Sequence, residues 1–144
     1  MKTILSAALL FIVSLAACNK SAEQVKEIEE EVMAIHDQVM PKMSDIMSLK
    51  KQLSAKMVEL DSLQQEGVSS TTLAEQKMKA MELSQELTTA DSLMMEWMYQ
   101  YRGDSAKALP AGDALVYFRL EKDKITDVQK RTNQSLEAAR DFLK

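Results

Sequence analysis

The stretch VKEIEEEVMAIHDQVMPKMSDIMSLKKQLSAKMVELDSL, residues 25–63, decides the fold of this chain. Its apolar residues recur at steps of three and four, which places their side chains on one face of an α-helix. The stretch therefore predicts one long amphipathic helix over about 22–66, with Gly67 just after its end. The apolar face comprises Val25, Ile28, Val32, Ile35, Val39, Met43, Ile46, Leu49, Leu53, Met57, Leu60 and Leu63.

The same spacing continues over two further segments, about 72–102 and about 113–143. Thr72 and Glu75 form a capping box that predicts the start of the second helix. The first connection is short, which predicts antiparallel neighbours, whereas the connection over 102–112 contains Gly, Asp, Ser and Pro and predicts a solvated crossing. With three Gly and two Pro in 144 residues, the chain is predicted to be all-α: an antiparallel three-helix, coiled-coil-like bundle forming one domain over 22–144.

Pro41 lies inside the first predicted helix. A proline there removes a backbone hydrogen bond and clashes with the carbonyl four residues earlier, which predicts a kink. If the first connection is centred near Ser69, antiparallel pairing sets His36 level with Arg102, and the residues before His36 extend beyond the second helix. Because this segment has its own apolar stripe, we expect a protruding helix that pairs with another subunit. The alternatives are a hinge that folds residues 22–39 back as a fourth helix, and a frayed stalk.

The first 17 residues, MKTILSAALLFIVSLAA, contain one Lys, an apolar run and then small residues. This pattern is typical of a secretory signal peptide, and the run is shorter than the about 20 residues of a transmembrane helix. The sequence Leu15-Ala16-Ala17-Cys18 resembles the lipobox of bacterial lipoproteins. The resemblance implies cleavage before Cys18 and covalent attachment of lipid to it, with residues 18–21 as the lipidated N-terminus.

The residues after Cys18 bear on the location of the protein. Two or more acyl chains hold a protein durably on a bilayer. Asn19, rather than Asp, follows the cysteine, so the resemblance does not imply retention in the inner membrane. Residues 19–22 lack the acidic cluster of some surface-displayed lipoproteins. The protein is therefore expected in the cell envelope, on the periplasmic face of the outer membrane.

Composition excludes several functions. The formal charge is −4 and no basic cluster is present, which argues against nucleic-acid binding. A single Cys cannot form an internal disulfide or a thiolate metal site. One His cannot supply the paired Glu-x-x-His motifs of a di-iron bundle. No Gly-rich phosphate loop or nucleophile elbow is present. We therefore predict no catalytic residues and no enzymatic activity.

A cluster of methionines around the single His is the one candidate ligand site. Met33, His36, Met40 and Met43 share a helix face, and the expected pairing brings residues of the second helix opposite them. Thioethers and imidazole suit Cu(I), and an indole beside a bound cation adds a cation–π contribution. The ligands of a copper site would be His36, Met40, Met43, Met94, Met98 and Trp97, with Met95 nearby and Tyr117 and Phe118 approaching from the third helix.

The sequence favours an ordinary role for the same residues. Methionine fills irregular gaps in cores, and Trp97 is a suitable anchor for a small bundle. His36 would be hydrogen-bonded to a neighbour such as Asp37. No cofactor is then expected besides the covalent lipid on Cys18, and metal binding is the alternative.

Two segments, HDQVMPKM at 36–43 and ADSLMMEWM at 90–98, make the chain resemble a group of small uncharacterised Bacteroidota lipoproteins labelled viral A-type inclusion protein-like. That label refers to coiled-coil-like composition, and the resemblance implies no enzymatic activity. Gln38 stands where relatives have an acidic residue. We therefore expect a non-enzymatic structural or interaction module that contacts the membrane through its lipid. Its expected partner is an envelope protein or a second copy bound through residues 25–39.

Overall fold

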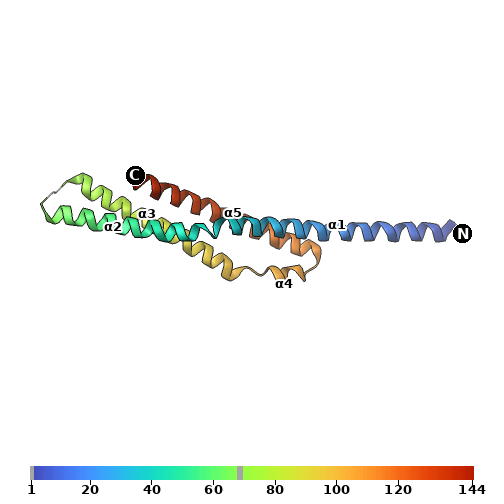
Figure 1. Cartoon of the computed structure of the whole chain (residues 1–144). Helices are drawn as coiled ribbons and strands as arrows, with labels where there is room; N and C mark the ends of the chain where they lie inside the picture. The colour runs from blue at the N-terminus through green and yellow to red at the C-terminus, as the bar shows by residue number, and fades with distance from the viewer. Residues whose placement is uncertain (1, 68–69) are drawn as a thin grey trace. The chain divides into compact units, whose positions relative to one another are not determined.

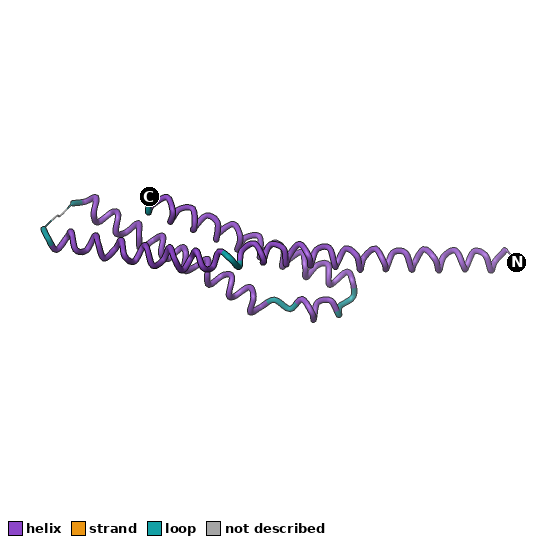
Figure 2. The backbone as a smooth tube through the Cα atoms, in the orientation of Figure 1, coloured by secondary structure: helices purple, strands orange, loops and turns teal. Residues whose placement is uncertain are grey.

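The computed structural model describes the backbone of residues 2–67 and 70–144, and the side chains of 21–67 and 70–144. Five helices follow in order: α1 (Lys2–Val39), α2 (Lys42–Gln65), α3 (Thr71–Gln100), α4 (Gly103–Lys107) and α5 (Ala111–Phe142) (Figure 1). Within these described residues there is no strand, and short loops join the helices (Figure 2). The predicted all-α class is confirmed.

Pro41 separates α1 from α2 and confirms the predicted bend in the first long helical segment. The Met40 amide still donates to the His36 carbonyl at 2.9 Å, which completes the last turn of α1. The Met43 amide then donates to the Met40 carbonyl at 3.1 Å, a tighter three-residue step. Because proline has no amide hydrogen, the regular four-residue ladder is broken at this position. Pro41 itself keeps helical dihedral angles, with φ −61° and ψ −26°.

The turn between α2 and α3 begins with a left-handed glycine. Gly67 has φ +87°, a conformation that costs little without a Cβ atom, and it follows the end of α2 as predicted. The start of α3 lies slightly earlier than the predicted capping box. The Ser70 hydroxyl accepts a hydrogen bond from the Leu73 amide at 3.1 Å. Ser70, rather than Thr72, therefore caps this helix.

Two compact units make up the chain. Unit 1 consists of Met1–Ala34 and Tyr101–Lys124, and unit 2 consists of Ile35–Gln100 and Ile125–Lys144. Helices α1 and α5 contribute residues to both units, whereas α2 and α3 belong to unit 2 and α4 to unit 1. No described helix has both the length and the hydrophobicity needed to cross a bilayer.

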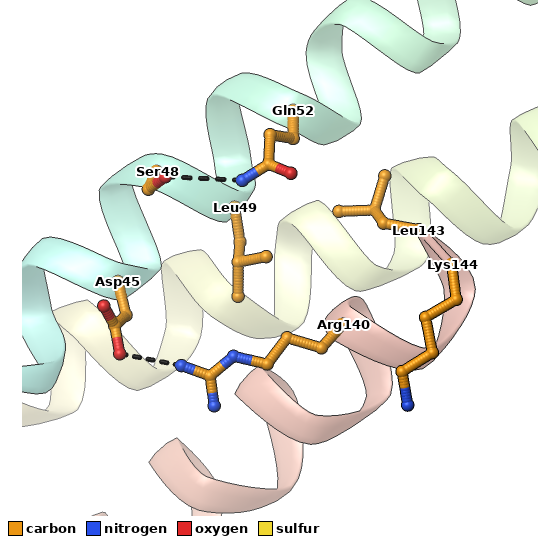
Figure 3. A pocket seen from close by; sticks show the side chains of 7 residues that line it. All are labelled: Asp45, Ser48, Leu49, Gln52, Arg140, Leu143 and Lys144. Atoms are coloured by element: carbon orange, nitrogen blue, oxygen red, sulfur yellow. Dashed lines mark hydrogen bonds and ion pairs between the residues drawn. The ribbon is translucent and has the colours of Figure 1, made fainter.

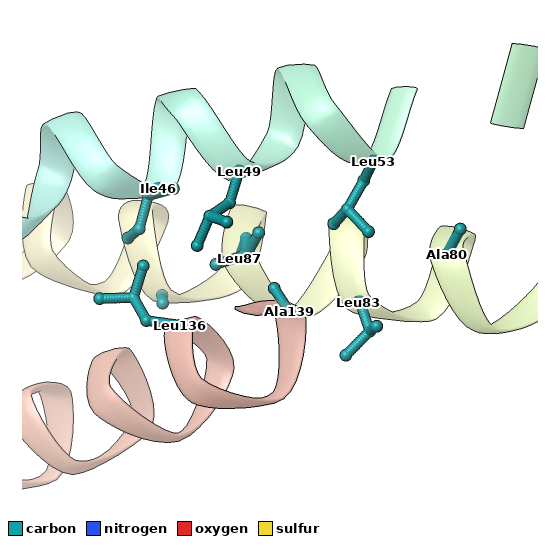
Figure 4. Packing of buried hydrophobic residues seen from close by; sticks show 9 residues of the cluster. Ile46, Leu49, Leu53, Ala80, Leu83, Leu87, Leu136 and Ala139 are labelled. Carbon is teal, nitrogen blue, oxygen red and sulfur yellow. The ribbon is translucent and has the colours of Figure 1, made fainter. Parts of the chain in front are cut away.

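The core of unit 2 lies between α2, α3 and the C-terminal part of α5 (Figure 4). Helix α2 contributes Ile46, Leu49 and Leu53, which face Leu83 and Leu87 of α3. Burial of each such side chain contributes about 1.5–3 kcal/mol. Buried positions recur every seven residues on α1 and α2, and at alternating steps of three and four on α3, the spacing of a coiled-coil seam. They are Val39, Ile46, Leu53 and Leu60 on α1 and α2, and Ala80, Leu83, Leu87, Ala90, Met94 and Trp97 on α3.

In the core of unit 1, the apolar stripe that includes Val25 and Val32 packs against other residues of the same chain. Val25 packs with Ala106, Ala114 and Phe118, and Val32 is fully buried. The expected protruding helix is therefore wrong for the described residues. The prediction paired the first segment with the second helix alone, whereas α4 and the first half of α5 belong to the same unit as residues 22–34.

Ion pairs also join α1 to its neighbours in unit 1. Lys107 on α4 lies 3.0 Å from Glu29, and Lys122 on α5 lies 2.6 Å from Glu31. The acidic residues that follow Val25 along α1 therefore have basic partners in the same unit. Self-association through residues 25–39 stays a prediction, although Val25, Val32 and Val39 of this stripe are buried within the chain.

The connection over 102–112 is not the simple solvated crossing that the sequence predicted. It contains α4, a single helical turn in which Gly103 and Ala106 are buried. A Cβ atom at Gly103 would lie 2.6 Å from the Tyr101 hydroxyl, so the close packing of the Tyr101 ring requires glycine here. Gly103 thus begins α4, whereas the sequence pattern predicted it as the end of the preceding helix.

One buried polar group in unit 2 yields a stability prediction. Thr132 of α5 is fully buried, and its hydroxyl has no hydrogen-bond partner. Thr132→Val removes this unsatisfied hydroxyl and keeps the shape, so we expect a gain of about 1–2 kcal/mol in the free energy of unfolding. The denaturant midpoint measures it. Thr89→Val, at an exposed position of α3, is the control and should change stability by less than about 0.5 kcal/mol. A loss of stability in Thr132→Val would contradict the prediction.

Candidate functional site

The predicted methionine, histidine and tryptophan cluster is partly assembled in unit 2. The His36 ring of α1 and the Trp97 ring of α3 have centroids 5.7 Å apart, with an angle of 36° between their planes. Trp97 is buried, with 5% of its surface exposed. His36 therefore meets Trp97, not Arg102, and the pairing differs from the predicted register by more than one helical turn.

The His36 side chain is hydrogen-bonded to its neighbour in sequence. Its Nδ1 atom lies 2.9 Å from Asp37 Oδ1, and 19% of the side chain is exposed. This contact is the ordinary role predicted for His36, and it is confirmed.

The candidate thioethers are divided between core and solvent. Met94 is fully buried, and Met43 packs against the core of unit 2. Met98 is half-buried, whereas Met40 and Met95 are exposed. Met33, Tyr117 and Phe118 of the predicted cluster belong to unit 1 instead.

No group of three or more His, Cys, Asp or Glu side chains suited to a metal ion occurs among the described residues. Of the proposed ligand set, His36 and Trp97 are in ring contact. Copper binding through this set therefore stays a prediction.

A polar cluster around α4 is the main feature of unit 1 that the sequence did not reveal. Lys107 Nζ lies 3.0 Å from both Glu29 Oε1 and Asp104 Oδ1. Hydrogen bonds to Glu29 and then to Asp104 raise the pKa of Lys107. Burial, followed by the negative charge of Glu29, raises the pKa of Tyr101 to about 12. At neutral pH Lys107 is therefore charged and the Tyr101 phenol is neutral.

The second tyrosine of this cluster fixes the entry to α4. The Arg102 amide donates to the Tyr117 hydroxyl at 2.6 Å, and the Tyr101 and Tyr117 ring centroids are 6.3 Å apart. Two hollows adjoin the cluster. One of about 290 Å³ is lined by Glu29 and residues 101–105, and one of about 340 Å³ is lined by Ala22, Val25, Lys26, Glu29, Lys107, Leu109, Ala111 and Ala114.

A larger hollow of about 470 Å³ lies in unit 2 between α2 and the end of α5 (Figure 3). Arg140 Nη2 donates to Asp45 Oδ2 at 2.7 Å across it, and Gln52 bonds Ser48 at 3.3 Å on one wall. Asp45 and Arg140, two of the charged residues that line this hollow, thus pair with each other. Asp45 and Arg140 are 95 residues apart, so no local spacing could have predicted their contact.

Cys18, the predicted lipidation site, lies outside the residues whose side chains are described. Comparisons with protein-family models, with curated proteins and with solved structures found no match to this chain.

Proposed function

We propose that this chain is a lipid-anchored protein of the bacterial cell envelope whose helical units serve as a non-enzymatic structural or interaction module. The observation that carries the proposal is the position of the only cysteine. Cys18 directly follows Leu15-Ala16-Ala17, at the end of an apolar leader that itself follows a single Lys. A signal peptide explains the leader, and lipidation explains why the cysteine stands at this point.

The anchor would attach the helical units to a membrane surface. Each buried CH₂ group contributes about 0.8 kcal/mol, so two or more acyl chains give lasting attachment. Asn19 favours export beyond the inner membrane, which supports a location on the periplasmic face of the outer membrane. The similarity of segments 36–43 and 90–98 to small Bacteroidota lipoproteins agrees with this assignment.

An interaction role agrees with the chemistry of the described surface. The hollows in both units are lined by side chains that pair with one another, as Asp45 does with Arg140 and Lys107 with Glu29. Enzyme sites instead combine a concave pocket with convergent polar groups of perturbed pKa. Long helices with charged outer faces are typical of proteins that act by binding other proteins.

Replacing the cysteine tests the anchor directly. We expect the wild-type chain, expressed in a bacterium with lipoprotein processing, to incorporate labelled palmitate and to sediment with membranes. Cys18→Ser should lose the label and leave the membrane fraction, because no thiolate remains to accept diacylglycerol. Asn19→Ser is the matched control and should keep both properties. Label and membrane attachment that persist in Cys18→Ser would refute the proposal.

A further inference from the structure

The connection from α4 into α5 is apolar although it is exposed. Residues 108–112 read Ala-Leu-Pro-Ala-Gly and contain no charged or polar side chain between Lys107 and Asp113. Four of the five are exposed, and Leu109 keeps 47% of its surface accessible. Surface loops are usually polar, because water solvates them. We call residues 108–112 the apolar loop.

The backbone of the apolar loop is hydrogen-bonded within the chain. The amides of Ala108 and Leu109 donate to carbonyls of α4 at 3.3 Å and 3.1 Å. Pro110 has no amide hydrogen, and its carbonyl accepts from two amides of α5 at 2.9 Å and 3.0 Å. An unpaired polar group is costly away from water. These three successive residues have no N–H group that needs water, so they can enter an apolar environment at low cost.

The apolar loop lies beside the N-terminal part of α1 in unit 1. Leu109 lines the same hollow of about 340 Å³ as Ala22 and Val25 of α1. Figure 1 shows that the turn between α4 and α5 is the part of these two helices nearest to the N-terminal end of α1. From there α5 runs alongside α1 toward later residues, since Lys122 pairs with Glu31. The apolar loop is therefore at the end of unit 1 where a chain cleaved before Cys18 would begin.

The chain between Cys18 and this hollow is short. Four residue steps separate Cys18 from Ala22, which span about 6 Å as a helix and at most about 14 Å when fully extended. The headgroup region of one leaflet is about 5–8 Å thick. Acyl chains on Cys18 would therefore hold the hollow close to the headgroups, whatever the conformation of residues 19–21.

The charged residues on either side of the apolar loop are accommodated by the chain. Lys107 Nζ lies 3.0 Å from both Glu29 and Asp104. Asp113 lies in the first turn of α5, where the helix dipole favours a carboxylate. A charge is costly near an apolar phase unless it is paired. The ion pairs of Lys107 lower that cost where the loop begins.

We propose that the apolar loop lies in the headgroup region of the membrane that holds the acyl chains of Cys18, with Leu109 as the inserted side chain. The proposal rests on the lipid anchor proposed above and extends it, because it names the protein surface that touches the bilayer. A single exposed leucine is normal on a protein surface. Here an uncharged loop, paired backbone amides and a tether of four residue steps occur together at one end of unit 1.

Fluorescence quenching in vesicles tests this contact. The lipidated chain with Leu109→Cys has one free thiol, because lipid blocks the sulfur of Cys18, and this thiol takes a nitrobenzoxadiazole probe. In phosphatidylcholine vesicles with a spin label on the headgroup, the probe should lose about half of its emission or more, because interfacial segments lie about 5–10 Å into the boundary of headgroups and acyl chains.

Leu120→Cys is the matched control within unit 1. Leu120 is 54% exposed and lies on α5, which begins at Ala111. Its distance from that beginning, roughly 14 Å along the helix, carries the probe away from the bilayer. The probe at position 120 should therefore lose less than about a tenth of its emission in the same vesicles.

A probe at a neighbouring position isolates the contribution of Leu109. With the probe on Ala108→Cys, Leu109→Asp should reduce the quenching about threefold or more, because a carboxylate is costly in an apolar environment. Leu109→Ile keeps the apolar surface and should leave the quenching unchanged. Positions 108 and 109 are exposed, so circular dichroism should show equal helix content in all of these variants.

Flotation of the labelled chain with the vesicles separates this contact from the anchor. A chain that floats while position 109 is quenched no more than position 120 would overturn the contact and leave the anchor in place. Quenching at position 108 that Leu109→Asp does not change would also overturn it, since the leucine would then contribute nothing. A chain that does not float would contradict the lipid anchor and this contact together.

Discussion

Trp97→Ala is expected to lower the free energy of unfolding by about 3–5 kcal/mol, the usual cost of removing a large aromatic side chain from a core. Trp97 is 5% exposed and occupies a position in the seam of α3, one step after the fully buried Met94. Its ring also packs against the His36 ring, with centroids 5.7 Å apart. Alanine would leave a cavity between α1 and α3 that the backbone can close only in part. The midpoint of chemical denaturation, followed by circular dichroism, measures the loss.

The control for Trp97 is an exposed side chain of the same unit. Met47→Ala, where the side chain is 65% exposed, should change stability by less than about 0.5 kcal/mol. Trp97→Phe should fall between the two, because it keeps a ring beside His36 but loses volume. An unchanged midpoint for Trp97→Ala would mean that the indole is not buried in solution and is accessible to a ligand.

Phe118→Ala is expected to have an effect of similar size, about 3–5 kcal/mol, in unit 1. Phe118 is fully buried and is the largest side chain of a small core that it shares with Val25, Ala106 and Ala114. The Tyr117 ring contacts its ring edge to face, at 5.3 Å and 82°. The other buried members of this core are small, and the larger side chains packed against it, such as Tyr101 and Tyr117, are only partly buried. Faster amide hydrogen exchange in residues 101–124 would report the loss.

A neighbouring leucine serves as the control for Phe118. Leu120 lies two residues later on α5 and is 54% exposed, so Leu120→Ala should leave exchange in residues 101–124 nearly unchanged. Equal acceleration in both variants would show that exchange in this segment reports helix propensity and not the loss of a packed ring.

The parts of the fold that could be predicted from sequence are those set by local spacing. Steps of three and four predict helices whatever their partners. Pro41 predicts the break because its missing amide hydrogen is a property of the residue itself, and Gly67 predicts the turn because it lacks a Cβ atom. These three features account for the helices of unit 2 and the join between α1 and α2.

The errors arose where distant segments meet. The prediction of a solvated crossing over 102–112 missed that Ala106 packs with Phe118 and with Val25, which lies about 80 residues earlier in the chain. The single turn α4 is too short to be stable from its own propensity. Its helical form depends on packing in unit 1 and on the bond from the Arg102 amide to the Tyr117 hydroxyl.

The candidate site likewise combines contacts between residues close in sequence, which could be predicted, with contacts between distant segments, which could not. The bond between His36 and Asp37 involves adjacent residues and could be predicted from the sequence. The sequence predicted that His36 and Trp97 lie near each other, but not that their rings are in contact. Which residues of two paired helices lie opposite each other depends on the loop and on the bend at Pro41. The pairs of Asp45 with Arg140 and of Glu29 with Lys107 left no local signal at all.

The join at Met40 and Pro41 keeps the buried positions of α1 and α2 at the same seven-residue interval. Val39 lies before it, Ile46 and Leu53 lie after it, and the seven-residue interval between buried positions is the same on both sides. Each added or deleted residue in a helix rotates everything downstream by about 100°. A one-residue insertion here would turn Ile46 and Leu53 out of the core, whereas a seven-residue insertion would restore them. The packing on both sides of this join therefore depends on the number of residues between Val39 and Ile46.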